Sequence, residues 1–179
     1  GNAFIFNHSS KISNDVVKIK ISDFGLARLL NNSSESMKYT SGLVTLYYRS
    51  PEILLNSNEY DESVDIWSIG CILSEILMGF PLFPGENELD QLQKIFKILG
   101  TPSSLTVNNS LFNKKHFLNT FSPKCIKEII NQVNPLVDES VLEIVDSCLK
   151  LNQKERLSAR KLLKFPFFKK EFQFLNEEL

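Results

Sequence analysis

One stretch of the sequence, residues 63–78, is apolar on nearly every side when it is drawn as a helix. Trp67 and Cys71 lie in its middle, and Gly79 followed by Pro81 marks its end. A helix that is hydrophobic all round has to be covered by other parts of the protein. We therefore expect a buried helix here.

The rest of the chain also predicts mostly helix. Leu89, Leu92, Phe96 and Leu99 follow amphipathic spacing before Gly100, which predicts a helix over 88–99. Polar residues without a hydrophobic period predict loops at 26–39 and 103–120. Further helices are predicted at 123–132, 138–151 and 158–164, and short strands at 3–6 and 16–21. The predicted fold class is mostly α, with a small β-hairpin at its N-terminal end.

The composition is that of a single globular lobe. The 179 residues are 42% hydrophobic and 23% charged, with a net charge of −1, which favours neither a nucleic-acid partner nor a membrane surface. The longest apolar stretch, residues 63–83, is interrupted by Asp65 and Glu75, so it does not predict a membrane span. Cys71, Cys125 and Cys148 share no metal-binding spacing, so we expect reduced thiols in an intracellular protein of the nucleus and/or cytoplasm.

Several polar motifs follow one another in a fixed order. Asp23-Phe24-Gly25 comes just after the strand-like run 16–21, and Ser50-Pro51-Glu52 stands downstream of it. The run Thr45-Leu46-Tyr47-Tyr48-Arg49 leads into Ser50, and Asp65-Ile66-Trp67 opens the apolar helix. Each motif alone recurs by chance, and Asp-Phe-Gly alone indicates only a turn at the end of a strand. Their shared order and spacing are specific.

Together these motifs resemble the C-terminal lobe of a eukaryotic protein kinase. The resemblance implies the C-lobe of the bilobal kinase fold, with a partial kinase domain over 1–170 and a C-terminal tail over 171–179. A glycine-rich loop, a strand lysine and the H-R-D aspartate do not occur in the sequence. We therefore expect a fragment that lacks kinase activity by itself. The alternatives are a non-catalytic lobe that acts as an interaction module, and a simple helical scaffold.

The resemblance implies ATP and Mg²⁺ as cofactors of the intact parent. Asp23 matches the metal-binding aspartate, and its carboxylate is the hard oxygen ligand that Mg²⁺ prefers. Asn2 matches the asparagine that ends the catalytic loop and binds the second metal ion; the alternative is a turn residue. Thr45 matches the threonine that steadies the catalytic aspartate in serine/threonine kinases, and its alternative role is structural.

Residues 26–49 resemble an activation loop. Thr40 is the expected phosphorylation site, for which an activating kinase is a partner, and Arg28 is a candidate clamp for the phosphate. The alternative is an unmodified threonine, with Ser33, Ser34, Ser36 and Ser41 as competing acceptors. A phosphate adds about two negative charges, so it orders a loop only where arginines gather.

Two further resemblances are structural. Glu52 is expected to form a buried ion pair with Arg156, and removing one partner of such a pair costs about 3–5 kcal/mol. Asp65 enters an apolar helix and is expected to bond backbone amides of the catalytic loop, since a charge there needs partners.

Four stretches are similar to the group of cyclin-dependent, mitogen-activated and glycogen-synthase kinases: residues 48–55, 82–92, 99–102 and 156–168. Gly42 stands where the latter two kinds carry a tyrosine, so the loop looks most like that of a cyclin-dependent kinase. The resemblance implies protein substrates with Ser/Thr-Pro sites and a cyclin-like activator as a possible partner. Arg49 is expected to shape a pocket for the proline, near Val44.

Overall fold

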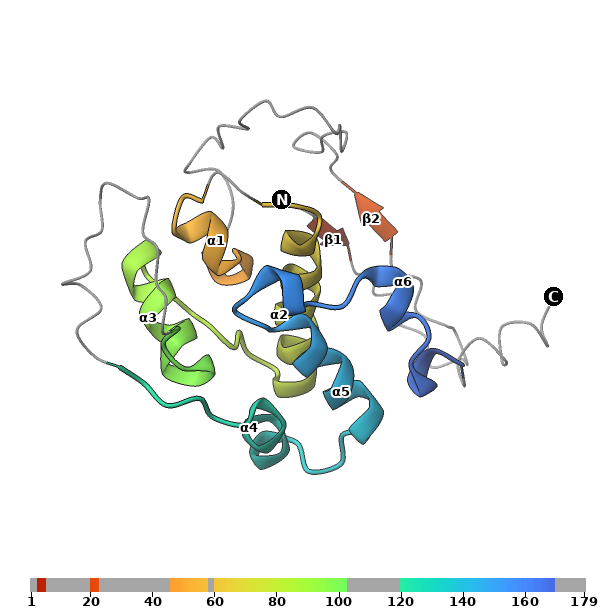
Figure 1. Ribbon diagram of the computed structural model, residues 1–179. Coiled ribbons are helices and arrows are strands. Elements are labelled where there is room, and N and C mark those ends of the chain that lie inside the picture. Colours follow the sequence, from red (N-terminus) through yellow and green to blue (C-terminus); the bar gives the residue numbers. More distant parts are fainter. Residues whose placement is uncertain (1–2, 6–19, 23–45, 58–59, 103–119, 170–179) are drawn as a thin grey trace. The chain divides into compact units, whose positions relative to one another are not determined.

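The structure is a computed structural model, and the chain divides into two units, Gly1–Thr45 and Leu46–Leu179, which are described separately. The first unit is described at its two strands, and the second over most of its length (Figure 1). The described residues are 3–5, 20–22, 46–57, 60–102 and 120–169.

In the first unit, strands β1 (Ala3–Ile5) and β2 (Lys20–Ser22) pair antiparallel. Their register joins Ala3 to Ser22 and Ile5 to Lys20. The first residue of β1 and the last residue of β2 therefore lie opposite one another at the same end of the sheet.

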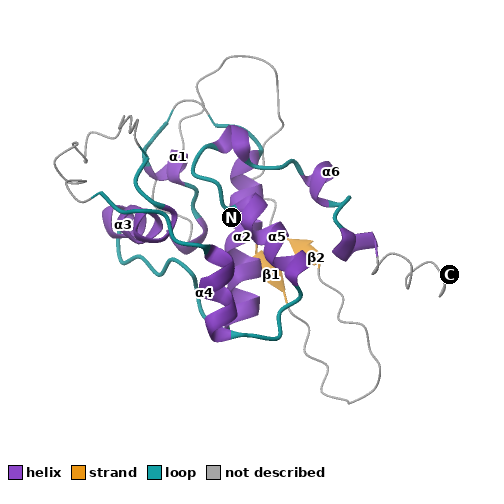
Figure 2. Ribbon diagram, turned by 60° about the horizontal axis from the view of Figure 1, so that its bottom comes forward, coloured by secondary structure: helices purple, strands orange, loops and turns teal. Residues whose placement is uncertain are grey.

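The second unit is helical, and the mostly α fold class is confirmed. α2 runs through its middle, and α5 and α4 pack beside it (Figure 2). The elements in chain order are η2 (Leu46–Tyr48), α1 (Pro51–Leu54), α2 (Ser63–Met78), α3 (Glu88–Leu99), α4 (Ile126–Val133), α5 (Glu139–Cys148), η4 (Gln153–Glu155) and α6 (Ala159–Leu162).

The predicted buried helix is α2, but it is not buried on every side. Trp67 is fully buried and stacks on Phe83 with ring centroids 5.8 Å apart, and Cys71 is buried beside it. Ile69 and Ile76, however, are 38% and 56% exposed. The prediction of all-round burial was therefore wrong. An apolar side chain is more stable when it is buried, but the sequence pattern of one helix does not determine which other segments pack against each of its faces.

Helix ends follow local signals. Gly79 closes α2 with a φ of 81°, the left-handed region that glycine adopts without strain. The side chain of Asn87 accepts a hydrogen bond of 3.0 Å from the backbone N–H of Asp90 and so caps α3. The predicted bounds of 88–99 are those observed.

The three C-terminal helices are shorter than predicted or shifted along the chain. α4 begins three residues later than expected, α5 ends at Cys148, and α6 covers only part of 158–164. Asp138 caps α5 by accepting a hydrogen bond of 2.8 Å from the N–H of Ser140. α1 was not predicted, although Ser50 before Pro51 is a common way for a helix to begin.

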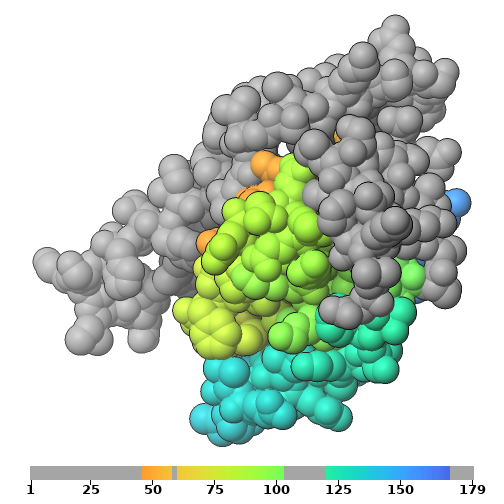
Figure 3. Space-filling model, turned by 90° about the vertical axis from the view of Figure 1, so that its left-hand side faces the viewer, coloured from red at the N-terminus to blue at the C-terminus, as the bar shows by residue number. Residues whose placement is uncertain are grey.

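Residues around 98–101 and 121–124 hold the end of α3 against the segment that leads into α4. The N–H of Lys124 donates to the carbonyl of Ile98 at 2.8 Å, and that of Thr101 donates to the carbonyl of Phe121 at 3.0 Å. Figure 3 shows this side of the unit, with α3 next to the segment before α4. Within the residues described, no helix combines the length and apolar character needed to cross a membrane.

Candidate active site

Most residues predicted to carry chemistry lie outside the described residues. These are Asn2, Asp23, Arg28, Thr40 and Thr45. In the part of the chain that the structure describes, no group of three His, Cys, Asp or Glu side chains could hold a metal ion.

The β-ladder pairs the sequence neighbours of the predicted metal ligands. Ala3 is the first residue of β1 and Ser22 the last of β2, and the register places them opposite one another. In the sequence, Asn2 directly precedes Ala3 and Asp23 directly follows Ser22. The two predicted ligands are thus the sequence neighbours of a single cross-strand pair.

Residues 46–50, here called the 46–50 segment, are held on one side by α2. The Tyr48 hydroxyl donates a hydrogen bond of 2.7 Å to the Glu75 carboxylate, and the Ser68 hydroxyl donates one of 3.0 Å to the Tyr48 carbonyl. Burial, together with the Glu75 carboxylate, raises the pKa of Tyr48 to about 12. Tyr48 is therefore a neutral donor throughout the physiological pH range.

On its other side the 46–50 segment contacts α3. Arg49 Nη1 lies 3.0 Å from Glu88 Oε1, and the two side chains are 12% and 28% exposed. The fully buried Gln91 donates to the Tyr47 carbonyl at 3.4 Å and accepts from the Gly85 N–H at 2.9 Å. A Cβ on Gly85 would lie 2.3 Å from Gln91 Oε1, so this turn requires glycine. Val44, the expected neighbour of Arg49, lies outside the described residues.

Glu52 and Arg156, predicted to pair, form a buried bidentate ion pair. Arg156 Nη1 and Nη2 donate to the two Glu52 carboxylate oxygens at 2.6 and 2.7 Å. Three further N–H groups of the guanidinium donate to backbone carbonyls of Lys150, Ser63 and Leu151. All five guanidinium donors are thus used.

The Arg156 guanidinium also lies over the Trp67 ring, 5.0 Å from its centroid. Through these contacts one side chain connects α1, the start of α2 and the segment after α5. Asp65, in the first turn of α2, is exposed. The catalytic-loop amides that it was expected to bond are not among the described residues.

The three cysteines are free thiols. Burial raises the pKa of Cys148 to about 12 and also raises that of Cys71, although Arg156 acts in the opposite direction on both. Both thiols therefore stay protonated and unreactive at neutral pH. Cys125 is exposed.

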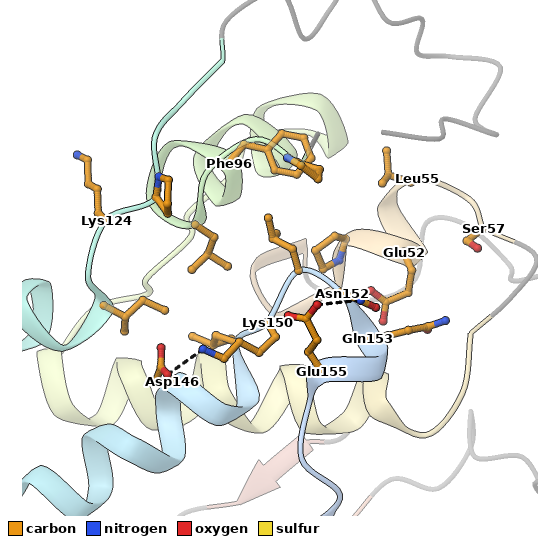
Figure 4. A pocket seen from close by; sticks show the side chains of 17 residues that line it. Glu52, Leu55, Ser57, Phe96, Lys124, Asp146, Lys150, Asn152, Gln153 and Glu155 are labelled. Carbon is orange, nitrogen blue, oxygen red and sulfur yellow. Dashed lines mark hydrogen bonds and ion pairs between the residues drawn. The ribbon is translucent and has the colours of Figure 1, made fainter. Parts of the chain in front are cut away.

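A pocket of about 800 Å³ lies between α1, the end of α3 and η4 (Figure 4). Its lining includes Leu55, Phe96 and Leu149, with charged side chains such as Lys150 and Glu155 around them. Glu52 is the one predicted site residue among the described residues that line it. The other predicted site residues that the structure describes in this unit, Arg49, Asp65 and Arg156, do not line it.

The helical second unit and its buried Glu52–Arg156 pair agree with what the resemblance to protein kinases implied. Residues 4–168 match the family model described as protein kinase domain, and the chain belongs to this family. Mitogen-activated protein kinase 12 of Danio rerio is 39% identical to the chain over 166 residues. The match covers 92% of this chain but only 44% of that relative.

The resemblance to the C-terminal lobe of a eukaryotic protein kinase is thus confirmed. Membership of the group of cyclin-dependent, mitogen-activated and glycogen-synthase kinases is confirmed as well. The narrower similarity to cyclin-dependent kinases stays a prediction. Sequence reasoning missed the roles of Glu75, Glu88 and Gln91. A carboxylate inside the apolar run of α2 was the available signal for Glu75, since a charge there requires a partner.

Proposed function

We propose that the intact protein transfers the γ-phosphoryl group of ATP to serine or threonine hydroxyls of proteins, and that it prefers sites followed by proline. Membership of the protein kinase family supports the reaction, and the relative from Danio rerio is a kinase by name. The observation that carries the proposal in this chain is the pairing of Ala3 with Ser22.

That pairing supports a metal site shared by Asn2 and Asp23. An amide oxygen and a carboxylate oxygen fit Mg²⁺, which prefers hard oxygen ligands. When bound, Mg²⁺–ATP supplies the phosphoryl group and neutralises charge on its oxygens. The part of Asn2 and Asp23 in the proposal is to hold and orient that complex, which makes them both metal and nucleotide ligands.

The 46–50 segment is the proposed binding surface for the protein substrate. Contacts from α2 and α3 hold its backbone at Tyr47 and Tyr48, so a peptide meets a preformed surface. Thr45, next to this segment in the sequence, is proposed to orient the catalytic aspartate of the intact enzyme and to favour hydroxyl acceptors of serine and threonine.

Thr40 is proposed as the regulatory phosphorylation site, with Arg28 as one ligand of its phosphate. The modification requires a separate activating kinase, and the likeness to cyclin-dependent kinases adds a cyclin-like activator to the proposal. Mass spectrometry of the protein from its own cells tests the site directly. Stoichiometric phosphate elsewhere in 26–45, with none on Thr40, would overturn the assignment.

The reaction is tested with the intact protein and Mg²⁺–ATP on a serine peptide. Asp23→Asn is expected to lower kcat by at least about 100-fold, because removing a preorganised charge ligand costs several kcal/mol of transition-state stabilisation. Asp146→Asn, a surface change of the same chemistry, is the matched control and is expected to leave kcat within about twofold. Full activity of Asp23→Asn, or no activity of the unmutated protein after activation, would overturn the proposal.

A further inference from the structure

The contacts of the 46–50 segment differ in kind along its length. Tyr47 and Tyr48 are held through their backbone carbonyls and the Tyr48 hydroxyl. Arg49 is held by an ion pair with Glu88 of α3. The backbone of the segment and the Arg49 guanidinium are therefore positioned by separate groups.

From this division we propose that Glu88 is a positioning residue that aims Arg49 and thereby sets the preference for the residue after the phosphorylated serine or threonine. This inference rests on the proposed function of the 46–50 segment. Glu88 acts through Arg49 and does not itself contact substrate.

Contacts around the start of α3 fix the place of Glu88 in the chain. It is the first residue of α3, directly after the cap Asn87, where a carboxylate also interacts favourably with the helix dipole. One turn later, the fully buried Gln91 ties the same helix to Tyr47 and to the Gly85 turn. The Glu88 backbone therefore cannot move without disturbing these bonds, so its carboxylate is preorganised toward Arg49.

The low exposure of Arg49 makes its direction sensitive to this partner. A guanidinium that is 12% exposed has lost most of its water, so removal of the carboxylate beside it changes the balance of contacts that orient it. Removing the Glu88 charge leaves the backbone contacts from Ser68 and Gln91 in place. The expected effect is thus on selectivity, while the binding surface itself persists.

The experiment measures kcat/KM of the intact, activated enzyme on two peptides that differ only in having proline or alanine after the serine. Glu88→Gln is expected to lower the proline-to-alanine ratio by about tenfold, the scale that one altered pocket contact produces. Turnover of the alanine peptide is expected to stay within about twofold. Glu86→Gln, at an exposed position two residues earlier, is the matched control and is expected to keep the unmutated ratio.

The possible failures are distinguishable. If the unmutated enzyme treats both peptides alike, the proline preference in the proposed function is wrong, and the inference falls with it. If the unmutated enzyme prefers proline, two results for Glu88→Gln would show that the positioning role alone is wrong. One is an unchanged proline-to-alanine ratio, and the other is an equal loss of kcat/KM on both peptides. Should Glu88→Gln melt at a lower temperature, Glu88→Asp provides the test: it keeps the charge on a shorter side chain and is expected to lower the ratio partially.

Discussion

Glu52 and Arg156 lie 104 positions apart in the sequence and face each other in the core, joined by hydrogen bonds of 2.6 and 2.7 Å. Because every guanidinium N–H also has a partner, this pair connects α1, α2 and the segment after α5 at a single point. The start of α1 follows the 46–50 segment directly, so the pair also anchors the surface proposed to receive substrate.

Breaking this pair should be costly. Glu52→Gln in the intact protein is expected to lower the free energy of unfolding by about 3–5 kcal/mol, because it leaves a buried guanidinium without its counter-charge. Urea denaturation followed by circular dichroism measures the change. Asp146→Asn breaks the half-exposed pair with Lys150 and serves as the control, with an expected cost of at most about 1 kcal/mol. Equal costs for the two variants would contradict the assigned role of the buried pair.

Tyr48→Phe should destabilise the protein in a pH-dependent way. Removing the hydroxyl that donates to Glu75 is expected to cost about 1.5–3 kcal/mol at pH 7, the range for a hydrogen bond to a charged group. The folded pKa of about 12 lies above the ordinary value of 10.0, so the stabilisation is fully present below pH 10 and is lost as the pH rises towards 12. The difference in stability between the two proteins should therefore be constant at pH 7 and 9 and smaller at pH 11. A difference that grows with pH would refute this sign.

The cysteines should separate into two classes towards a thiol-reactive dye. Cys125 is exposed and is expected to react in the native protein, whereas buried Cys71 and Cys148 should react only after unfolding. Cysteines elsewhere in the intact protein are distinguished by peptide mapping of the labelled sites. Rapid native labelling of Cys148 would show that α2 and α5 separate readily.

Gly70→Ala should destabilise the protein although alanine favours helices. A Cβ at this position would lie 2.7 Å from Cys148 Cβ and 2.9 Å from Leu149 side-chain atoms. Glycine in a helix costs about 1 kcal/mol relative to alanine, but forcing a methyl group into a packed contact typically costs about 1–3 kcal/mol. We expect a lower melting temperature, and a higher one would mean that α5 shifts away from α2 at little cost.

Local features of the chain were predictable where they depend on near neighbours. The bounds of α3 follow from Asn87, which caps it, and from Gly100 at its end, both within a few residues of the bonds that they affect. The short α1 was missed, since a single helical turn offers no hydrophobic period to detect. The exposure of Ile69 and Ile76 could not be predicted either, because it depends on what packs against α2.

The sequence by itself determined the family, the order of the motifs and the long apolar helix, since these depend on residue types and spacing along the chain. It also indicated the Glu52–Arg156 pair, though only through resemblance to a known family. Only the tertiary structure decided that Tyr48 bonds Glu75 and that Arg49 meets Glu88, 27 and 39 positions away. Helix caps and periods act over a few residues, whereas the partner of a partly buried charge is chosen by which distant surfaces the folded core brings together.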